Sequence, residues 1–276
     1  SPGFGAPPPF WMELRRPPFY TNRLDLAFEI ITSQTNQVPP TNNLGQKWLQ
    51  IPDTSTNGLD VKATFPPKIL ADDFLCTATG PITQVRIWGS WLYDNVPPTN
   101  TPPCFALGLW TDVPVSATNT SFSRPGTRLC SRTFSANQYT NFVYANGVQE
   151  LFFDPNIPGI IGSDTVIWEY VFNLPTNNSC WRQTNGNVYW LSVQADCMDT
   201  NLYLFGWKTC PTNWNDDAVF GDSPTFNAPP PFWSDGRFTD PRQPVVGVSW
   251  TDATAFCAGL SGGRGRPHRR GFGPMI

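Results

Sequence analysis

Two pairs of adjacent aspartates have the residue types and spacing that could support chemistry. Asp72–Asp73 lies in ILADDFL and Asp216–Asp217 lies in TNWNDDAVF. Glycoside hydrolysis needs two carboxylates about 5–10 Å apart across the scissile bond. Since neighbours on a strand point to opposite faces, a working pair would take one member from each doublet, such as Asp73 with Asp217. Calcium binding by the four carboxylates is a second use. The simplest interpretation is that one aspartate of each pair caps a turn and the other is solvated.

The single histidine excludes several classes of active site. It is His268, near the C-terminal end of the chain. Ser–His–Asp and Cys–His mechanisms need an imidazole held against the nucleophile, and many zinc and copper sites use imidazole as a ligand. We therefore assign no catalytic residue. In the alternative that the chain is an enzyme, Asp73 and Asp217 are the candidate catalytic residues.

Tryptophan is abundant, with 12 copies, and suggests a carbohydrate site. Trp88, Trp91, Trp110 and Trp207 are the candidate ligand-binding residues, because an indole face stacks on the apolar side of a sugar ring. Trp88 and Trp91 are three positions apart, so they face opposite sides of a strand. Core packing is the alternative for each residue taken singly.

The seven cysteines indicate an oxidising compartment. No CxxC pair is present, so a zinc ribbon or thioredoxin-like site is not expected. Six cysteines lie in the body of the chain and Cys257 stands alone near its end. We expect disulfides among the six, with Cys180–Cys210 as a specific pairing, because both would lie at one end of a hairpin. Buried free cysteines are the alternative.

The elements that must position these residues are short strands. The 276 residues include 30 Pro and 22 Gly, which suit turns rather than helices. We predict an all-β fold, a jelly-roll-like β-sandwich, with an up-and-down barrel as second choice. The clearest predicted strands are Ile69–Leu75, Ile82–Leu92, Cys104–Thr111, Thr127–Phe134, Val148–Phe153, Thr165–Asn173, Asn187–Ala195 and Leu202–Thr209.

Charge and hydropathy restrict the partners. The net charge is −3, and all 21 acids lie before residue 261 while four of the 18 bases follow it. An acidic body argues against nucleic acid as the partner. No apolar run approaches the roughly 20 residues that span a membrane.

A repeated string suggests a tandem arrangement. Residues 1–11 read SPGFGAPPPFW and residues 223–233 read SPTFNAPPPFW, agreeing at nine of eleven positions. We expect residues 1–38 to end a preceding repeat, 39–233 to form the sandwich, and 234–276 to be an appendage with one helix and a basic tail. Because only the first copy is followed by LDLAFEI, we expect Leu24–Thr32 to fill a vacant sheet edge, within the chain or in a neighbouring copy.

Several strings carry a resemblance to a known family. They are KWLQIPD, GLDVKATFPPKILADDFLC, GPITQVRIWGSWLYD, FFDPNIPGIIGSDTVIWEYVF, VYWLSVQA and FGWKTCPTNWNDDAVFGDSP. They resemble a domain of unknown function found in large secreted proteins of planctomycete-type bacteria. The resemblance implies a secreted β domain and no established activity.

A second, shorter resemblance lies in the appendage. PVVGVSWTDATAFCAGL, residues 244–260, is similar to a segment of formylglycine-generating-enzyme-like domains. It predicts a strand at Val245–Val248 and a helix capped by Ser249, with Asp252 completing a capping box. The catalytic cysteines and calcium ligands of that family are absent from this segment, and Gly259 replaces its usual Trp. No catalytic role is carried over to Cys257.

These observations favour a secreted, non-enzymatic module for glycan binding, adhesion or cell-surface assembly. Polysaccharide, or neighbouring copies joined by strand exchange, are the expected partners. Calcium is the only cofactor that the sequence suggests. A carbohydrate-active hydrolase or lyase that uses aspartates is the alternative.

Overall fold

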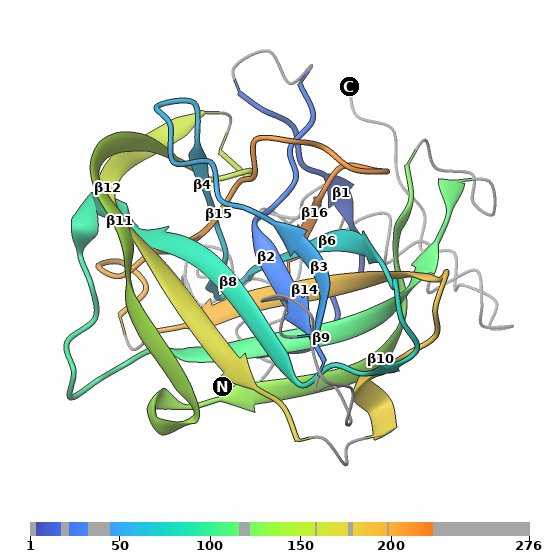
Figure 1. Ribbon diagram of the computed structural model, residues 1–276. Coiled ribbons are helices and arrows are strands. Elements are labelled where there is room, and N and C mark those ends of the chain that lie inside the picture. The colour runs from blue at the N-terminus through green and yellow to red at the C-terminus, as the bar shows by residue number, and fades with distance from the viewer. Residues whose placement is uncertain are drawn as a thin grey trace, which may run out of the picture. The chain divides into compact units, whose positions relative to one another are not determined.

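The computed structural model describes residues 4–17, 22–32, 45–115, 122–157, 159–175, 179–197 and 199–222. Within these ranges the chain is all-β, and its only helices are three-residue 3-10 turns. Two main sheets pack together in a sandwich-like arrangement (Figure 1). The predicted appendage helix, Cys257, His268 and the second APPPFW string lie outside the described residues.

The first sheet has seven strands, and nearly all its pairings are antiparallel. Its order is β1-β16-β6-β14-β9-β10, and β5 pairs in parallel with β14. The strands are β1 (Met12–Glu13), β16 (Val219–Asp222), β6 (Lys68–Leu75), β14 (Val188–Asp196), β9 (Cys104–Val113), β10 (Arg124–Phe134) and β5 (Thr64–Phe65).

The second sheet also has seven strands, in the order β12-β11-β4-β15-β8-β2-β3. The strands are β12 (Ile160–Asn173), β11 (Tyr139–Phe153), β4 (Leu59–Lys62), β15 (Phe205–Lys208), β8 (Gln84–Trp91), β2 (Phe28–Ile31) and β3 (Gln46–Gln50). Because β12 also pairs with β8, the five strands β8, β12, β11, β4 and β15 close into a ring. A separate two-stranded sheet joins β7 (Gly80–Pro81) to β13 (Arg182–Gln183).

All eight predicted strands coincide with strands of the structure: β6, β8, β9, β10, β11, β12, β14 and β15. The largest difference is in β11, which begins at Tyr139, well before the predicted start at Val148. Five consecutive residues near the start of β11 are exposed, so the alternation that marks a half-buried strand is missing there.

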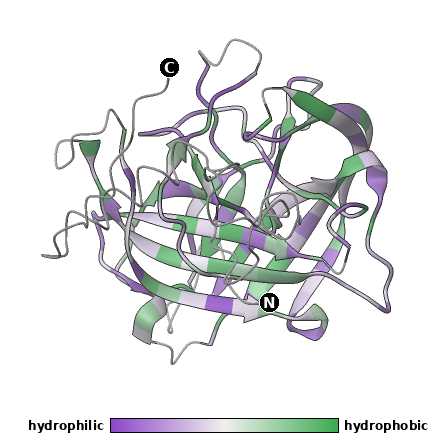
Figure 2. Ribbon diagram, turned by 180° about the vertical axis from the view of Figure 1, so that it is seen from behind, coloured by the Kyte–Doolittle hydropathy of each residue, from purple (hydrophilic) through white to green (hydrophobic). Residues whose placement is uncertain are grey.

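The main core lies between the two sheets and is rich in aromatic side chains. Phe105 on β9 illustrates the packing, because its ring lies 4.8 to 5.4 Å from the rings of Tyr139, Tyr170, Phe172 and Phe205 on the other sheet. Hydrophobic residues recur along the strands that face this core (Figure 2). Edge-to-face contacts of this kind stabilise a core beyond the area that they bury.

The first APPPFW string packs on the outer face of the first sheet. Trp11 contacts the Trp110 ring edge-to-face at 5.7 Å, and Pro8 lies against Gly221 of β16. Trp110, Trp190 and Val219 belong to a second, smaller apolar cluster, against which Trp11 packs. The central strands β6 and β14 are therefore covered on both faces, and all but one residue of β6 and all but the two end residues of β14 are buried.

The predicted closing segment pairs within the same chain. β2 lies between β8 and β3, antiparallel to both, and its neighbour Leu26 bridges to Thr209. Leu26, Phe28 and Ile30 are fully buried. The segment therefore occupies an interior position of the second sheet, and β3 forms the edge instead.

The predicted Cys180–Cys210 disulfide was wrong. Cys180 is bonded to Cys130 of β10, whereas Cys210 is a buried free thiol, as are Cys76 and Cys197. The pairing assumed that the strands after Cys180 and before Cys210 form a hairpin. They are β14 and β15, which belong to different sheets.

Breaking the Cys130–Cys180 bond should destabilise the chain substantially. The two cysteines are 50 residues apart, and cross-linking a loop of that length stabilises a fold by about 4 kcal/mol in the chain-entropy description. We expect Cys130→Ser with Cys180→Ser to lower the urea midpoint, and mass spectrometry of unreduced peptides to recover a linked 130–180 pair. A linked 180–210 peptide would contradict this topology.

Candidate functional site

The four predicted sugar-binding tryptophans are buried. Trp88, Trp91, Trp110 and Trp207 are at most 4 % exposed. The Trp91 Nε1–H donates to the Tyr170 hydroxyl, and the Trp207 Nε1–H donates to the Ala27 carbonyl. These indoles pack the interior, so none of them offers a face to a sugar.

A different aromatic pair is partly exposed. The rings of Trp48 on β3 and Trp214 meet edge-to-face, with centroids 4.7 Å apart. Both side chains are only partly buried. Sequence reasoning missed this pair because the two residues are far apart in the chain and neither stands in a strongly aromatic strand.

The aspartate doublets do converge, through an asparagine. The Asn215 side-chain amide donates to Asp73 and, over 2.9 Å, to Asp216. The Ser123 hydroxyl also donates to Asp216. Burial raises the pKa of Asp73 to about 9. Asp73 is fully buried, so it cannot reach a polymeric substrate in this conformation.

Asp72 faces a different network. Its carboxylate accepts the Leu26 backbone N–H at 2.6 Å, and the Gln50 amide lies 3.4 Å from both Asp72 and Asp25. Asp25 accepts the Trp214 backbone N–H at 2.6 Å. Burial raises the pKa of Asp25 to about 7, and burial together with the charge of Asp25 raises that of Asp72 well above its usual value.

Asp217 is neutralised by two arginines. Its carboxylate lies 2.9 Å from an Arg15 nitrogen and 2.5 Å from the Arg23 Nε. Both arginines come from the N-terminal segment, which this ion pair fastens to the loop before β16. The alternative catalytic pair, Asp73 with Asp217, therefore consists of a buried carboxylate and a carboxylate engaged by cations.

An open polar pocket adjoins the chain segment that carries Trp214, although neither Trp48 nor Trp214 belongs to its lining. Its volume is about 880 Å³. It is lined by Arg16, Asn22, Arg23, Leu24, Asp53, Ser55, Asn57, Thr209, Cys210, Pro211 and Asn213. Asn213 directly precedes Trp214. Asp53 is the one carboxylate in this lining, and it already accepts hydrogen bonds from the Ser55 N–H and hydroxyl.

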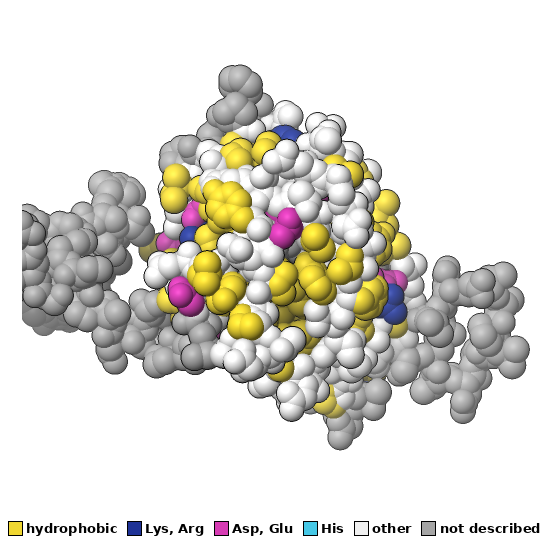
Figure 3. All heavy atoms as spheres, turned by 90° about the vertical axis from the view of Figure 1, so that its left-hand side faces the viewer, with side chains coloured by type: hydrophobic (Ala, Val, Ile, Leu, Met, Phe, Trp, Pro, Cys, Tyr) yellow, Lys and Arg dark blue, Asp and Glu magenta, His cyan; other side chains and the backbone are white. Residues whose placement is uncertain are grey.

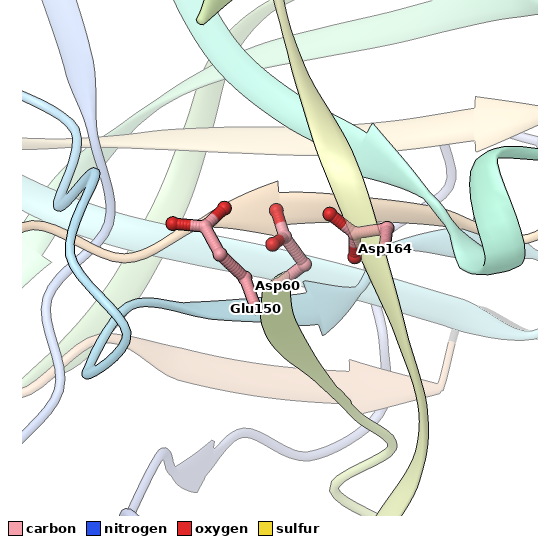
Figure 4. Close-up of side chains that lie close together, drawn as sticks. All are labelled: Asp60, Glu150 and Asp164. Carbon is pink, nitrogen blue, oxygen red and sulfur yellow. The ribbon is translucent and has the colours of Figure 1, made fainter. Parts of the chain in front are cut away.

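A second polar group lies inside the five-stranded ring. Asp60, Glu150 and Asp164 are buried, and one ligand atom of each lies within 4.8 Å of the others. They lie in a row, with Asp60 in the middle (Figure 4). Lys208 Nζ lies 3.0 Å from Asp60 and 2.5 Å from Glu150. We call Asp60, Glu150, Asp164 and Lys208 the ring cluster.

Burial dominates the electrostatics of the ring cluster. It raises the pKa of Asp164 to about 9 and that of Glu150 to about 7, and the pKa of Asp60 is raised as well. Burial alone would lower the pKa of Lys208, but Asp60 and Glu150 outweigh it and raise that pKa. Among the described residues this is the one group of three or more acids, cysteines or histidines with the spacing of metal ligands.

The β11–β12 hairpin carries exposed apolar side chains. Phe142, Tyr144, Val148 and Leu151 on β11 are each between 37 % and 48 % exposed. Figure 3 shows hydrophobic side chains gathered on the side of the molecule where this hairpin lies. This surface is distinct from the polar pocket.

Comparison with known proteins identifies a family. A family model described as a domain of unknown function, DUF7901, matches residues 46–253, well over half of the chain. The match begins at β3 and runs past the boundary expected at residue 233. No curated protein and no solved structure matches the chain. No helix among the described residues is both long and apolar enough to cross a membrane. The chain belongs to the DUF7901 family.

Proposed function

We propose that this chain is a non-enzymatic extracellular module that binds polysaccharide, built on a jelly-roll-like sandwich. The observation that carries the proposal is the open polar pocket whose lining includes Asn213, the residue directly before Trp214 of the partly exposed Trp48–Trp214 pair. Its lining offers guanidinium, amide, carboxylate and hydroxyl groups, which can form hydrogen bonds with sugar hydroxyls. The partly exposed Trp214, next in the chain to Asn213 of this lining, would supply the apolar face on which a pyranose ring stacks.

The carboxylates favour binding over hydrolysis. Most glycoside hydrolases place two carboxylic acids across the scissile bond. Asp53 is the one acid in the pocket lining, and Asp73 and Asp217 are almost fully buried. The pocket therefore has the polar groups for recognition without an acid–base pair.

An extracellular location is part of the proposal. The Cys130–Cys180 disulfide supports it, because such bonds persist chiefly in oxidising compartments. The resemblance of its sequence to domains of secreted proteins supports the same location.

A second candidate function is assembly with neighbouring copies at a cell surface. The exposed apolar side chains of β11, including Phe142 and Tyr144, favour it. Self-association that increases with concentration and is abolished by Phe142→Asp would support assembly in place of glycan binding.

Trp48→Ala should weaken polysaccharide binding without unfolding the chain. Losing one stacked indole costs on the order of 1–3 kcal/mol by analogy with base–aromatic stacking, so retention in affinity gels containing a bound polysaccharide should fall at least about fivefold. Asn57→Ala, in the pocket lining, should also reduce retention.

Phe142→Ala is the matched control, because it removes an exposed aromatic from a different surface. Its retention should equal that of the unaltered chain. Equal retention of the Trp48→Ala variant and the unaltered chain, across every polysaccharide that binds, would place the binding surface elsewhere.

A further inference from the structure

The ring cluster and the neighbouring Ser90 draw on every strand of the closed ring. β4 contributes Asp60, β11 Glu150, β12 Asp164 and β15 Lys208, and β8 contributes Ser90. All five side chains are at most 2 % exposed. The polar groups therefore converge from five separate strands on one water-excluded interior, whereas a solvated acidic patch would lie on the surface.

The cluster is unbalanced in charge. Three carboxylates face one ammonium group, and the Lys208 ammonium is engaged by Asp60 and Glu150. Two further acids act on the cluster through their charge, Asp53 on Glu150 and Asp94 on Asp60. A buried set of charges is stable only when it is paired, so the fully ionised cluster lacks two positive charges.

Several oxygens in the cluster have no partner. The carboxylate oxygens Asp60 Oδ1, Glu150 Oε1 and both of Asp164 are buried and accept no well-formed hydrogen bond. The Ser90 hydroxyl faces Asp60 and Asp164, and its single proton can be donated to only one of these carboxylate oxygens. Buried polar atoms in native proteins nearly always have a partner, so the three or more carboxylate oxygens left without a donor at one place indicate a missing ligand.

The backbone holds two acids face to face. Glu150 and Asp164 are directly opposed on the antiparallel pair β11–β12. Like charges in that position destabilise a sheet. The register shifts between Asn146 and Glu150, where Gly147 has a φ of 88°. A bulge of this kind changes the direction in which the following side chains point, and Glu150 here points toward the ring interior.

From this geometry we propose that the ring cluster is a calcium site, with Asp60, Glu150, Asp164 and Ser90 as ligands and Lys208 as a neighbouring counter-charge. One divalent cation supplies the two missing positive charges. Oxygen-only donors suit a hard cation, and calcium takes six to eight oxygens at about 2.3–2.6 Å. Two oxygens on one such ion lie no more than about 5 Å apart, which agrees with the 4.8 Å limit of the three carboxylates.

The turn that precedes β4 covers the ring cluster on one side. A Cβ atom at Gly58 would lie 2.8 Å from Lys208 Nζ and 3.0 Å from Glu150 Oε1, so the backbone itself covers the cluster. An ion bound there is enclosed, and it would be removed fully only when the chain opens. The protein for the test is therefore unfolded and refolded in chelator before calcium is added.

Calcium should raise the melting temperature of this refolded chain. A ligand that binds only the native state stabilises it by mass action, and a hundredfold excess over the dissociation constant gives a shift of roughly 5–10 °C for a domain of this size. Equilibrium dialysis should find one calcium per chain. Asp164→Asn should remove both the shift and the bound ion, because it removes one negative charge and replaces one ligand oxygen with an NH2 group that cannot bind a cation.

Asp73→Asn is the matched control. It neutralises another buried aspartate with a raised pKa, and it lies in the doublets that the sequence also suggested as calcium ligands. Its calcium shift should equal that of the unaltered chain. If Asp164→Asn does not fold, the number of calcium ions bound per unaltered chain in equilibrium dialysis tests the proposal by itself. No bound calcium, or loss of the shift in Asp73→Asn but not in Asp164→Asn, would overturn the proposal.

Discussion

Removal of residues 1–32 is expected to abolish folding of the chain. The deletion takes away β1 and β2 and, with them, the fully buried side chains of Leu26, Phe28 and Ile30. Truncating one such side chain typically costs about 2–5 kcal/mol, and whole domains are stable by only about 5–15 kcal/mol. It also leaves β8 and β3 without the strand between them. Circular dichroism and gel filtration should show an aggregated or unfolded product.

A peptide of residues 22–32 should rescue the shortened chain when the two are refolded together. A control peptide with Phe28→Asp and Ile30→Asp should not, because both side chains must enter the core. A shortened chain that folds and stays monomeric would show that β2 is dispensable. For the intact chain, light scattering measures the molar mass. A molar mass that increases with concentration would show that this strand is exchanged between copies and does not pair within one chain.

Lys208→Met is expected to destabilise the chain by about 3–5 kcal/mol. Lys208 is fully buried and is the ammonium group that pairs with Asp60 and Glu150. Removing one partner of a buried ion pair leaves an uncompensated charge, and Met replaces the lost volume without replacing that charge. Urea unfolding at neutral pH in chelator measures the loss directly.

Arg86→Met provides the comparison for Lys208→Met. Arg86 also faces two acids, Glu29 at 3.4 Å and Glu169 at 3.5 Å, but its side chain is 33 % exposed. Water screens such a pair, so its removal should cost about 1 kcal/mol or less. Equal losses for the two variants would mean that burial does not set the energetics of the ring cluster.

The strands could be predicted from the sequence because their signals are local. Val166, Tyr170 and Phe172 lie on one face of β12 at even spacing, and Pro- and Asn-rich turns separate the strands. The pairing of those strands is not local. Nothing near Cys180 or Cys210 shows that β14 and β15 diverge to different sheets, and this is why the disulfide prediction was wrong.

The candidate sites were harder to predict, for two physical reasons. A tryptophan in a strand has the same local pattern whether its face is buried, as in Trp88, or partly exposed, as in Trp48. The ring cluster depends on closure between β8 and β12, which brings Asp60 and Asp164 together across about a hundred residues of sequence. The doublets attracted attention because their members are adjacent. The ring cluster is less apparent because no member has a second charged residue next to it in the sequence.

The central claim, that the chain binds polysaccharide without cleaving it, is tested most directly by one assay. The purified chain is incubated with a panel of polysaccharides, and both retention and newly formed reducing ends are measured in the same samples. We predict retention on at least one polysaccharide, weakened by Trp48→Ala, with no increase in reducing ends. New reducing ends that disappear in Asp73→Asn or Asp217→Asn, or no retention on any member of the panel, would contradict the account.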